Sequence, residues 1–240
     1  MNQSSNSIEI KDLSFRWHPQ SEVVLELSSL TIKAGERVFI EGPSGSGKST
    51  LLSLLAGVSL PQAGVIKVLN QQLDKLGNVQ RDRFRSQHIG FIFQMFNLIP
   101  YLSMVDNVLL PCRFSRDRQS RALQRSATIE DEAIRLLGHL DMARQDLLLK
   151  PVTSLSVGQQ QRVAAARALM GAPEILIADE PTSSLDAHRR ESFVRLLFQE
   201  CEAVGSTLVF VSHDTSLKNL FDRTLNLTEI NAANSTPLES

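Results

Sequence analysis

One stretch near the start of the chain constrains the fold more than any other. The pattern G-x-x-x-x-G-K-[ST] is filled at every position by Gly42-Pro43-Ser44-Gly45-Ser46-Gly47-Lys48-Ser49-Thr50. Its glycines let the backbone curl without Cβ clashes, so that successive N–H groups point inward at an anion. An apolar helical segment follows at 51–56 and presents the positive end of its dipole there. The stretch therefore predicts a loop that binds polyphosphate.

The residues on either side support this prediction. An apolar strand is predicted at 37–41, which gives the order strand, loop, helix that a phosphate loop requires and a Gly/Ser linker would lack. We expect Lys48 to reach the β- and γ-phosphates as a point charge. The hydroxyl of Ser49 is expected to complete the coordination of a Mg²⁺ ion, and Thr50 to cap or pack nearby.

Composition excludes several other classes of protein. The 240 residues carry 25 basic and 26 acidic side chains, a net charge of −1, so no global field favours nucleic acid and we expect no such partner. Cys112 and Cys201 match no metal or redox spacing and indicate packing residues in a reducing compartment. No apolar run approaches roughly 18 residues, and the first residues lack the order of a signal peptide, so we expect a chain that is neither spanning nor secreted.

Periodicity predicts an α/β fold. Short alternating apolar runs between residues 8 and 40 indicate antiparallel strands ahead of the loop, and further strands are predicted at 65–69, 88–93, 175–178 and 207–211. Apolar residues at helical spacing in 103–110 and 130–140 indicate a small helical lobe inserted into the core. We expect ordered structure from about residue 8 to 227, with loose tails at both ends.

Polar residues stand where predicted strands end. They are Gln94, Asp179, Glu180 and His213. Ligands collect at the carboxyl ends of parallel strands, so these side chains are expected to converge on the phosphate loop. Asp179 is suited to hold Mg²⁺ through water, and Glu180 to polarise the water that attacks the γ-phosphate. Gln94 can touch both metal and water, and His213 either donates to the γ-phosphate or the water or is structural.

Two further features leave alternatives open. Trp17, the only tryptophan, can lay its indole against a flat ring such as adenine or pack in the core. Five arginines crowd into thirteen residues and form either a solvated face or a basic surface near a membrane. They are Arg113, Arg116, Arg118, Arg121 and Arg125.

The segment Leu155-Ser156-Val157-Gly158-Gln159-Gln160-Gln161-Arg162 resembles the signature sequence of the ATP-binding cassette (ABC) family. With it come Trp17, placed like the adenine-stacking aromatic, Gln94 like the Q-loop residue, and 175–181 like the Walker B strand. Residues 183–186 resemble the D-loop, and His213 the switch histidine. The resemblance spans nearly the whole chain and implies an ATP hydrolase that uses ATP and Mg²⁺.

The resemblance also implies an architecture. It is a P-loop NTPase (ABC ATPase) with a RecA-like core, an N-terminal antiparallel β subdomain and an inserted α-helical subdomain. Residues 1–228 would form this single domain, with core and β subdomain at about 8–94 and 165–228, the helical subdomain at about 95–164, and a C-terminal tail at 229–240.

In this family two subunits sandwich ATP head to tail, which implies a homodimer. Ser156, Gly158 and Gln159 would bind the γ-phosphate of the nucleotide held by the other subunit, at the N-terminus of the signature helix. Asp186 would lie at the interface, or merely favour the positive end of the helix that follows it. Val157 stands where the commonest signature has glycine, and a β-branched residue resists positive φ. We therefore hypothesise slower or more partner-dependent turnover unless that position has negative φ.

Residues 90–100, 106–108 and Pro111 resemble the macrolide-export and lipoprotein-release branch of the family. That implies an integral-membrane permease subunit with few membrane helices (FtsX/MacB-like), and a location on the cytoplasmic face of the inner membrane through that permease. Phe96, Leu98 and Tyr101 would form the groove for the permease, or belong to the core. The alternative function is a regulatory ABC ATPase that signals through a membrane partner to envelope enzymes without transport.

Overall fold

The computed structural model describes residues 6–142, 145–183 and 185–235. Two compact units are present. The first contains the residues up to Arg85 together with those from Val209 onward, and the second contains Ser86–Leu208. The helical segment expected at 95–164 lies wholly within the second unit.

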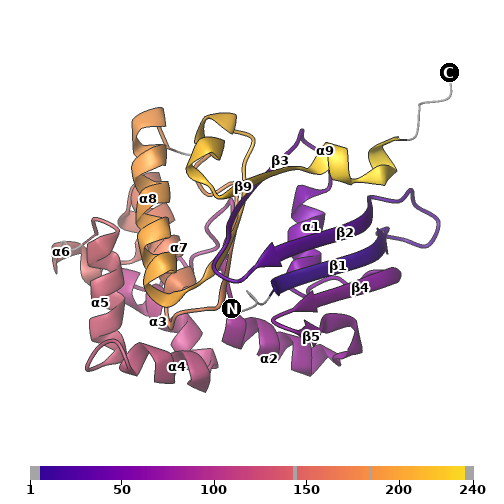
Figure 1. Ribbon diagram of the computed structural model, residues 1–240. Coiled ribbons are helices and arrows are strands. Elements are labelled where there is room, and N and C mark those ends of the chain that lie inside the picture. Colours follow the sequence, from indigo (N-terminus) through magenta and orange to yellow (C-terminus); the bar gives the residue numbers. More distant parts are fainter. Residues whose placement is uncertain (1–5, 143–144, 184, 236–240) are drawn as a thin grey trace, which may run out of the picture. The chain divides into compact units, whose positions relative to one another are not determined.

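In the first unit, the antiparallel sheet predicted ahead of the phosphate loop is present. Its strands follow the order β2-β1-β4-β5 and lie side by side in Figure 1. Their bounds are Asn6–Phe15 for β1, Leu25–Lys33 for β2, Ala63–Val68 for β4 and Gln71–Gln72 for β5. Ile10 pairs with Leu30 on one side and Ile66 on the other, and all three are buried. Apolar alternation places these residues on one face, which fixes the register.

The same unit holds the strands that carry the phosphate loop. Strand β3 (Arg37–Glu41) pairs in parallel with β9 (Arg223–Asn226), a short strand that the sequence analysis missed. The end of β8 (Thr207–Val211) lies beside β3, since the Ser212 N–H donates to the Ile40 carbonyl at 3.3 Å. Phe39 of β3 stacks on Phe210 of β8 with ring centroids 5.9 Å apart, which ties the two strands together beneath the loop.

Helices and short turns complete this unit. Helix α1 (Lys48–Leu55) follows the loop, and α2 (Asn78–His88), also missed from sequence, extends into the second unit. The remaining elements are the 3-10 turns η1 (Leu73–Lys75), η3 (Thr215–Leu220) and η4 (Ala232–Ser235) and helix α9 (Leu227–Ile230).

The C-terminal end departs from expectation. A tail is predicted from residue 229, yet α9 and η4 continue the secondary structure to Ser235. Asn231 is buried, and its side chain accepts from the Glu26 N–H at 2.8 Å and donates to the Val24 carbonyl at 2.9 Å. These bonds satisfy backbone groups at the start of β2, which explains why the segment is held. The expected loose residues 1–5 and 236–240 lie outside the described residues.

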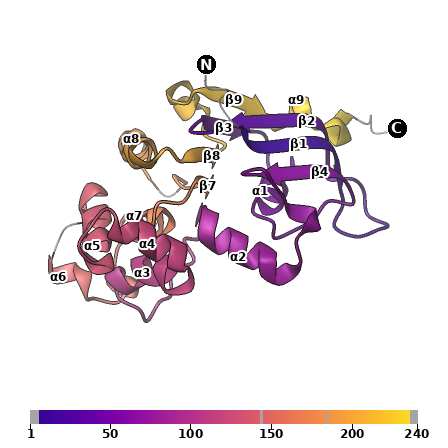
Figure 2. The same ribbon diagram turned by 60° about the horizontal axis from the view of Figure 1, so that its bottom comes forward.

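The second unit combines a parallel strand pair with a helical cluster. Strand β6 (Ile89–Ile92) pairs with β7 (Ile175–Asp179), both close to their predicted positions. The helices are α3 (Met104–Phe114), α4 (Arg116–Leu123), α5 (Ile129–His139), α6 (Gln145–Leu148), α7 (Val157–Leu169) and α8 (Ala187–Val204), with the turn η2 (Val152–Ser154). Figure 2 shows α3, α4, α5 and α7 gathered together. Helices α3 and α5 confirm the predicted helical lobe.

The solvated interpretation of the arginine run fits only Arg113 and Arg116, which are exposed, whereas the other three arginines are buried or half-buried. Arg118 is buried, with 2% of its surface exposed, and donates to the carbonyls of Ala168 and Met170 at the C-terminal end of α7. Arg125 contacts the buried carboxylate of Glu132 at 3.2 Å. The guanidinium groups of Arg118 and Arg125 thus stabilise a helix end and pair with a buried acid, so the five arginines do not share one basic face.

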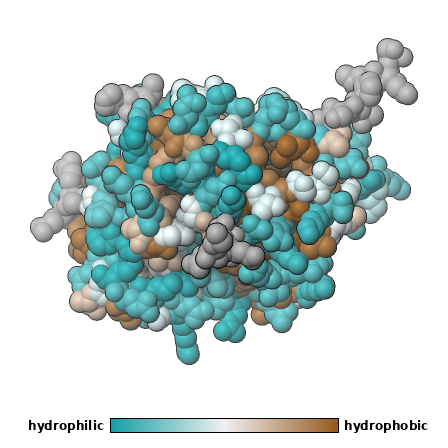
Figure 3. Space-filling view, in the orientation of Figure 1, coloured by the Kyte–Doolittle hydropathy of each residue, from teal (hydrophilic) through white to brown (hydrophobic). Residues whose placement is uncertain are grey.

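Apolar surface is limited on the face drawn in Figure 3, where hydrophobic residues are scattered among hydrophilic ones. Within the described residues, no helix combines the length and the apolar character that crossing a membrane requires.

Candidate nucleotide site

The phosphate loop occupies the turn between β3 and α1, in the predicted order of strand, loop and helix. Gly45 and Gly47 have φ of +81° and +97°, in the left-handed region that side chains disfavour. A Cβ on Gly47 would lie 2.8 Å from the Leu25 side chain. Ser49 and Thr50 lie in the first turn of α1, where Thr50 is buried. The glycines therefore give the loop the tight curl that an anion cradle needs.

Lys48 begins α1 and turns its side chain back over the loop. Its Nζ donates to the carbonyls of Gly42 at 2.7 Å and Pro43 at 2.8 Å. An ammonium group has three N–H donors, so it can retain part of this anchoring while meeting an anion. The positive charge of Lys48 is thus held at the mouth of the loop by two carbonyl groups of the loop.

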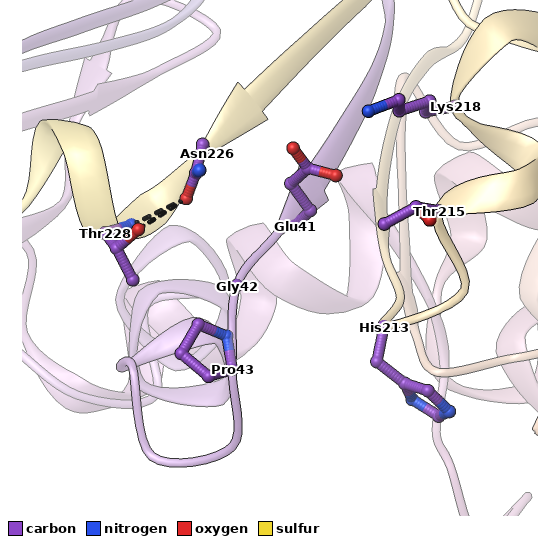
Figure 4. Close-up of a pocket in the computed structure, with 8 residues that line it drawn as sticks. All are labelled: Glu41, Gly42, Pro43, His213, Thr215, Lys218, Asn226 and Thr228. Carbon is purple, nitrogen blue, oxygen red and sulfur yellow. Dashed lines mark hydrogen bonds between the residues drawn. The ribbon is translucent and has the colours of Figure 1, made fainter.

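A cavity of about 410 Å³ adjoins the loop. Figure 4 shows its lining residues, which come from the ends of β3, β8 and β9 and from the turns that follow: Glu41, Gly42, Pro43, His213, Thr215, Lys218, Asn226 and Thr228. His213 and the first residues of the phosphate loop, Gly42 and Pro43, thus line one cavity. Strand β9 brings Asn226 and Thr228 to the cavity.

Five of the lining residues are not predicted from the sequence: Glu41, Thr215, Lys218, Asn226 and Thr228. Glu41 carried a signal, since it directly precedes the loop. Its Oε2 is buried and has no hydrogen-bond partner within the part of the chain that the structure describes. Asn226 and Thr228 carried none, because β9 lacks the apolar run that marks a strand.

Trp17 follows β1 and is 54% exposed, so it does not pack in the core. Its ring meets Phe15 edge-on, with centroids 5.1 Å apart and planes at 86°. Such an edge contact steadies the indole while leaving much of its surface accessible. Of the two interpretations left open by the sequence, core packing is wrong.

The remaining predicted residues lie in the second unit. Gln94 is exposed two residues after β6, and Asp179 is the last residue of β7. Glu180 comes next with φ of +48°, an uncommon conformation for a non-glycine residue and one that often marks functional sites. The convergence of these residues with the phosphate loop of the first unit stays a prediction.

The signature segment forms the start of α7. Ser156 is the N-cap: its hydroxyl accepts from the Gln159 N–H at 3.4 Å, and the Gln159 side chain accepts from the Ser156 N–H at 2.9 Å. This capping box leaves the hydroxyl proton of Ser156 available for an anion. Val157 is the first helical residue, lacks positive φ and is 54% exposed. The position therefore tolerates valine, which removes the physical basis for slower turnover.

Asp186 caps α8, accepting from the Arg189 N–H at 3.0 Å. The simpler of its two interpretations, a stabilising charge at a helix N-terminus, is therefore present in the structure. Ser184 of the same segment lies outside the described residues.

A family model described as ABC transporter matches residues 25–183, more than half of the chain. The chain belongs to the ABC transporter family. This confirms the resemblance identified from the signature, and with it an ABC ATPase fold, ATP as the ligand and ATP hydrolysis as the class of reaction.

Curated relatives and solved structures agree with this assignment. A lipoprotein-releasing system ATP-binding protein, LolD of Pseudomonas fluorescens, is 37% identical over 90% of this ABC ATPase and 91% of its own length. A macrolide export ATP-binding/permease protein, MacB of Rhodopirellula baltica, is 40% identical over 85% of this chain but 29% of its own. The dimeric cassette MJ0796, bound to ADP and Pi in a post-hydrolysis state, superposes with a TM-score of 0.78 at 33% identity, covering 91% of this chain and 93% of that one.

Proposed function

We propose that this ABC ATPase is the ATP-binding and ATP-hydrolysing subunit of a transporter and drives a separate membrane permease. The observation that carries the proposal is the shared cavity of the phosphate loop and His213, with the Lys48 ammonium held at the mouth of the loop. The first residues of the loop, Gly42 and Pro43, line this cavity together with His213, and the Lys48 ammonium donates to the carbonyls of the same two residues. This arrangement of a phosphate loop, a nearby positive charge and a histidine suits a nucleotide polyphosphate.

The nucleotide contacts are proposed as follows. The loop residues Gly42 to Thr50 cradle the phosphates, and Trp17 stacks on the adenine. Glu180 serves as the general base that takes a proton from the attacking water, with His213 and Lys48 stabilising the γ-phosphate. Ser49, Gln94 and Asp179 would hold Mg²⁺, since their hydroxyl, amide and carboxylate oxygens are the hard donors this ion prefers. The ion would supply charge neutralisation of the phosphates.

Two copies are proposed to pair head to tail around ATP. The similar cassette MJ0796 is dimeric in two solved structures, which supports the pairing. Ser156, Gly158 and Gln159 would then bind the γ-phosphate of the partner's nucleotide, and Asp186 would lie at the interface. The free hydroxyl proton of the Ser156 cap and the helix dipole favour that anion.

The proposed partner is an FtsX/MacB-like permease, reached from the cytoplasmic face of the membrane. Support comes from the relatives, because LolD is named for lipoprotein release and MacB for macrolide export joined to a permease. This chain spans less than a third of the MacB protein that it matches. We propose that closure of the ATP dimer pulls on the permease, and that reopening follows phosphate release.

Gel filtration of the Glu180→Gln variant tests the core of the proposal. The glutamine amide of this variant cannot accept a proton from the attacking water, so ATP should be bound without being hydrolysed. The variant should therefore elute as a closed dimer in the presence of ATP and Mg²⁺. Lys48→Ala is the matched control and should stay monomeric, because it weakens binding of the phosphates. Monomer for Glu180→Gln at saturating ATP would refute the sandwich.

Affinity purification tests the partner. Tagged Glu180→Gln protein, expressed in its native host and held with Mg²⁺ and ATP, should bring down a permease with few membrane helices after gentle solubilisation. Recovery of a permease with many membrane helices would still support the transporter function. It would refute the assignment to the macrolide-export and lipoprotein-release branch. Recovery of envelope hydrolase regulators with the permease, and no transported solute, would favour the regulatory alternative.

A further inference from the structure

The loop that carries Gln94 is folded in an unusual way. Two successive residues within it, Phe96 and Asn97, have φ of +60° and +49°. The Phe96 N–H donates to the Phe93 carbonyl at 2.9 Å, and the Asn97 N–H donates to the Met95 carbonyl at 2.6 Å. The turn therefore closes around Gln94. Neither left-handed residue is glycine, so the surroundings must hold this conformation.

Arg167, near the end of the signature helix α7, supplies that support. Its Nη1 donates to the Asn97 carbonyl and its Nη2 to the Phe96 carbonyl, each at 2.6 Å. Successive carbonyls of an extended chain point to opposite sides, whereas in a left-handed turn they point the same way. The planar fork of a guanidinium can therefore take both at once.

The charge of Arg167 is otherwise uncompensated. Burial lowers the pKa of this guanidinium, and within the described part of the chain no carboxylate pairs with it. The two carbonyl oxygens are its partners. Placing a half-buried cation against two carbonyl oxygens costs solvation free energy, and the two charge-assisted hydrogen bonds offset that cost by fixing the carbonyls in place.

The far end of the same loop is anchored separately. Asn107 of α3 is fully buried; its Oδ1 accepts from the Ile99 N–H at 2.8 Å, and its Nδ2 donates to the Ile99 carbonyl at 3.1 Å. Met95, which directly precedes the residues that Arg167 binds, is 81% exposed and contributes little packing. The start of the turn is held by the stacking of Phe93 on Phe91, with ring centroids 4.2 Å apart. Arg167 thus attaches the part of the turn that follows Gln94 and Met95.

We propose that Arg167 is a positioning residue that clamps the Gln94 loop to the signature helix, so that the two elements keep a fixed relation during turnover. The clamp itself stands on the geometry of this unit. Its effect on turnover rests on the proposed function, in which Gln94 contacts the metal and the attacking water.

Hydrogen exchange tests the clamp directly. Arg167→Lys keeps the charge and the stem but loses the fork, so peptides covering residues 93–98 should exchange about tenfold faster, while the remainder of the chain is unchanged. The matched control is Arg121→Lys on α4, whose guanidinium also donates to two carbonyls, those of Gly171 and Gln87, away from this loop. Equal exchange of 93–98 in wild type and Arg167→Lys would overturn the clamp.

A double-mutant cycle tests the route to turnover. Arg167→Lys should lower kcat about tenfold and leave the ATP affinity within about twofold. In the Gln94→Ala background the same substitution should leave kcat unchanged, because the residue it positions is gone. A further loss of about tenfold in kcat in the Gln94→Ala background would show that Arg167 does not act through Gln94. If Gln94→Ala alone keeps wild-type kcat, the role of Gln94 in the proposed function fails, whereas faster exchange of 93–98 still supports the clamp.

Discussion

Arg135 of α5 and Glu200 of α8 form a two-pronged ion pair, with both N–O distances at 3.0 Å. The same guanidinium also contacts the Glu132 carboxylate, with an N–O distance of 2.8 Å. Both acids are buried, with side chains 2% exposed for Glu132 and 5% for Glu200. Arg125 adds a second positive charge, 3.2 Å from Glu132 and 3.8 Å from Glu200. Arg135 therefore bridges two buried carboxylates and joins the helical lobe to the helix before β8.

Removing that arginine should destabilise the protein strongly. Arg135→Met leaves two buried charges poorly compensated, so we expect a loss of about 3 kcal/mol in the free energy of unfolding, measured with urea. Arg195→Met is the control: its pair with Glu191 is largely exposed, and the loss should stay below about 1 kcal/mol. Similar losses in both variants would contradict the assigned role of the buried pair.

The same cluster predicts a pH dependence. Burial alone would raise the pKa of Glu200, but the hydrogen bonds and charges of Arg135 and His139 outweigh it and hold the pKa below its usual value. A carboxyl group whose pKa is lower in the folded state than in the unfolded state stabilises the fold at pH values above its ordinary pKa of about 4.3. That stabilisation is lost as the pH falls through the pKa of the folded state. Without Arg135 most of the lowering of this pKa is lost and only the part from His139 remains. The difference in stability between wild type and Arg135→Met should therefore become smaller as the pH falls from about 5 to 3. A constant gap would count against the mechanism.

Trp17 should report on ATP through its fluorescence. As the single tryptophan and 54% exposed, it should change its emission when adenine covers it. Trp17→Ala should weaken ATP binding about tenfold, in the range of base–aromatic stacking. Trp17→Phe keeps an aromatic face and should bind within about threefold of wild type. If Trp17→Ala binds ATP as wild type does, the stacking role is lost.

Val157→Gly should change ATPase activity by less than about twofold, because the valine already has helical backbone at the start of α7. Its main effect should be a loss of about 0.5–1 kcal/mol from the entropy of glycine in a helix. Val157→Ala, which keeps the backbone restricted, separates that entropy from loss of the side chain. A several-fold faster Val157→Gly enzyme would restore the hypothesis that valine slows turnover.

Cys112 should be unreactive in the folded protein. Burial raises the pKa of its thiol to about 11, so the thiolate that reacts is scarce at pH 8. Cys201 is buried as well. A chromogenic disulfide reagent should therefore label neither thiol within minutes at pH 8, and both after unfolding in urea. Rapid labelling of one thiol, lost in Cys112→Ser, would show that the site opens.

The predictable part of this protein is local. The phosphate loop, strands 175–179 and 207–211 and the cap of α7 at Ser156 depend on residues within a few positions of one another. Loop glycines, the alternation of apolar residues in strands and a capping serine act on the backbone next to them. The local structure that they produce can therefore be predicted from neighbouring residues.

Tertiary structure decided the environment of each side chain. Arg118 looks like its exposed neighbour Arg116 in sequence, yet it is buried because the carbonyls that receive it, at Ala168 and Met170, come from 50 residues away or more. Arg167 likewise binds the carbonyls of Phe96 and Asn97, which are distant in sequence. The exposure of Trp17 also depends on which other segments reach it in the folded chain. Burial and hydrogen-bond partners arise from contacts between distant segments, and a linear pattern does not encode which segments meet.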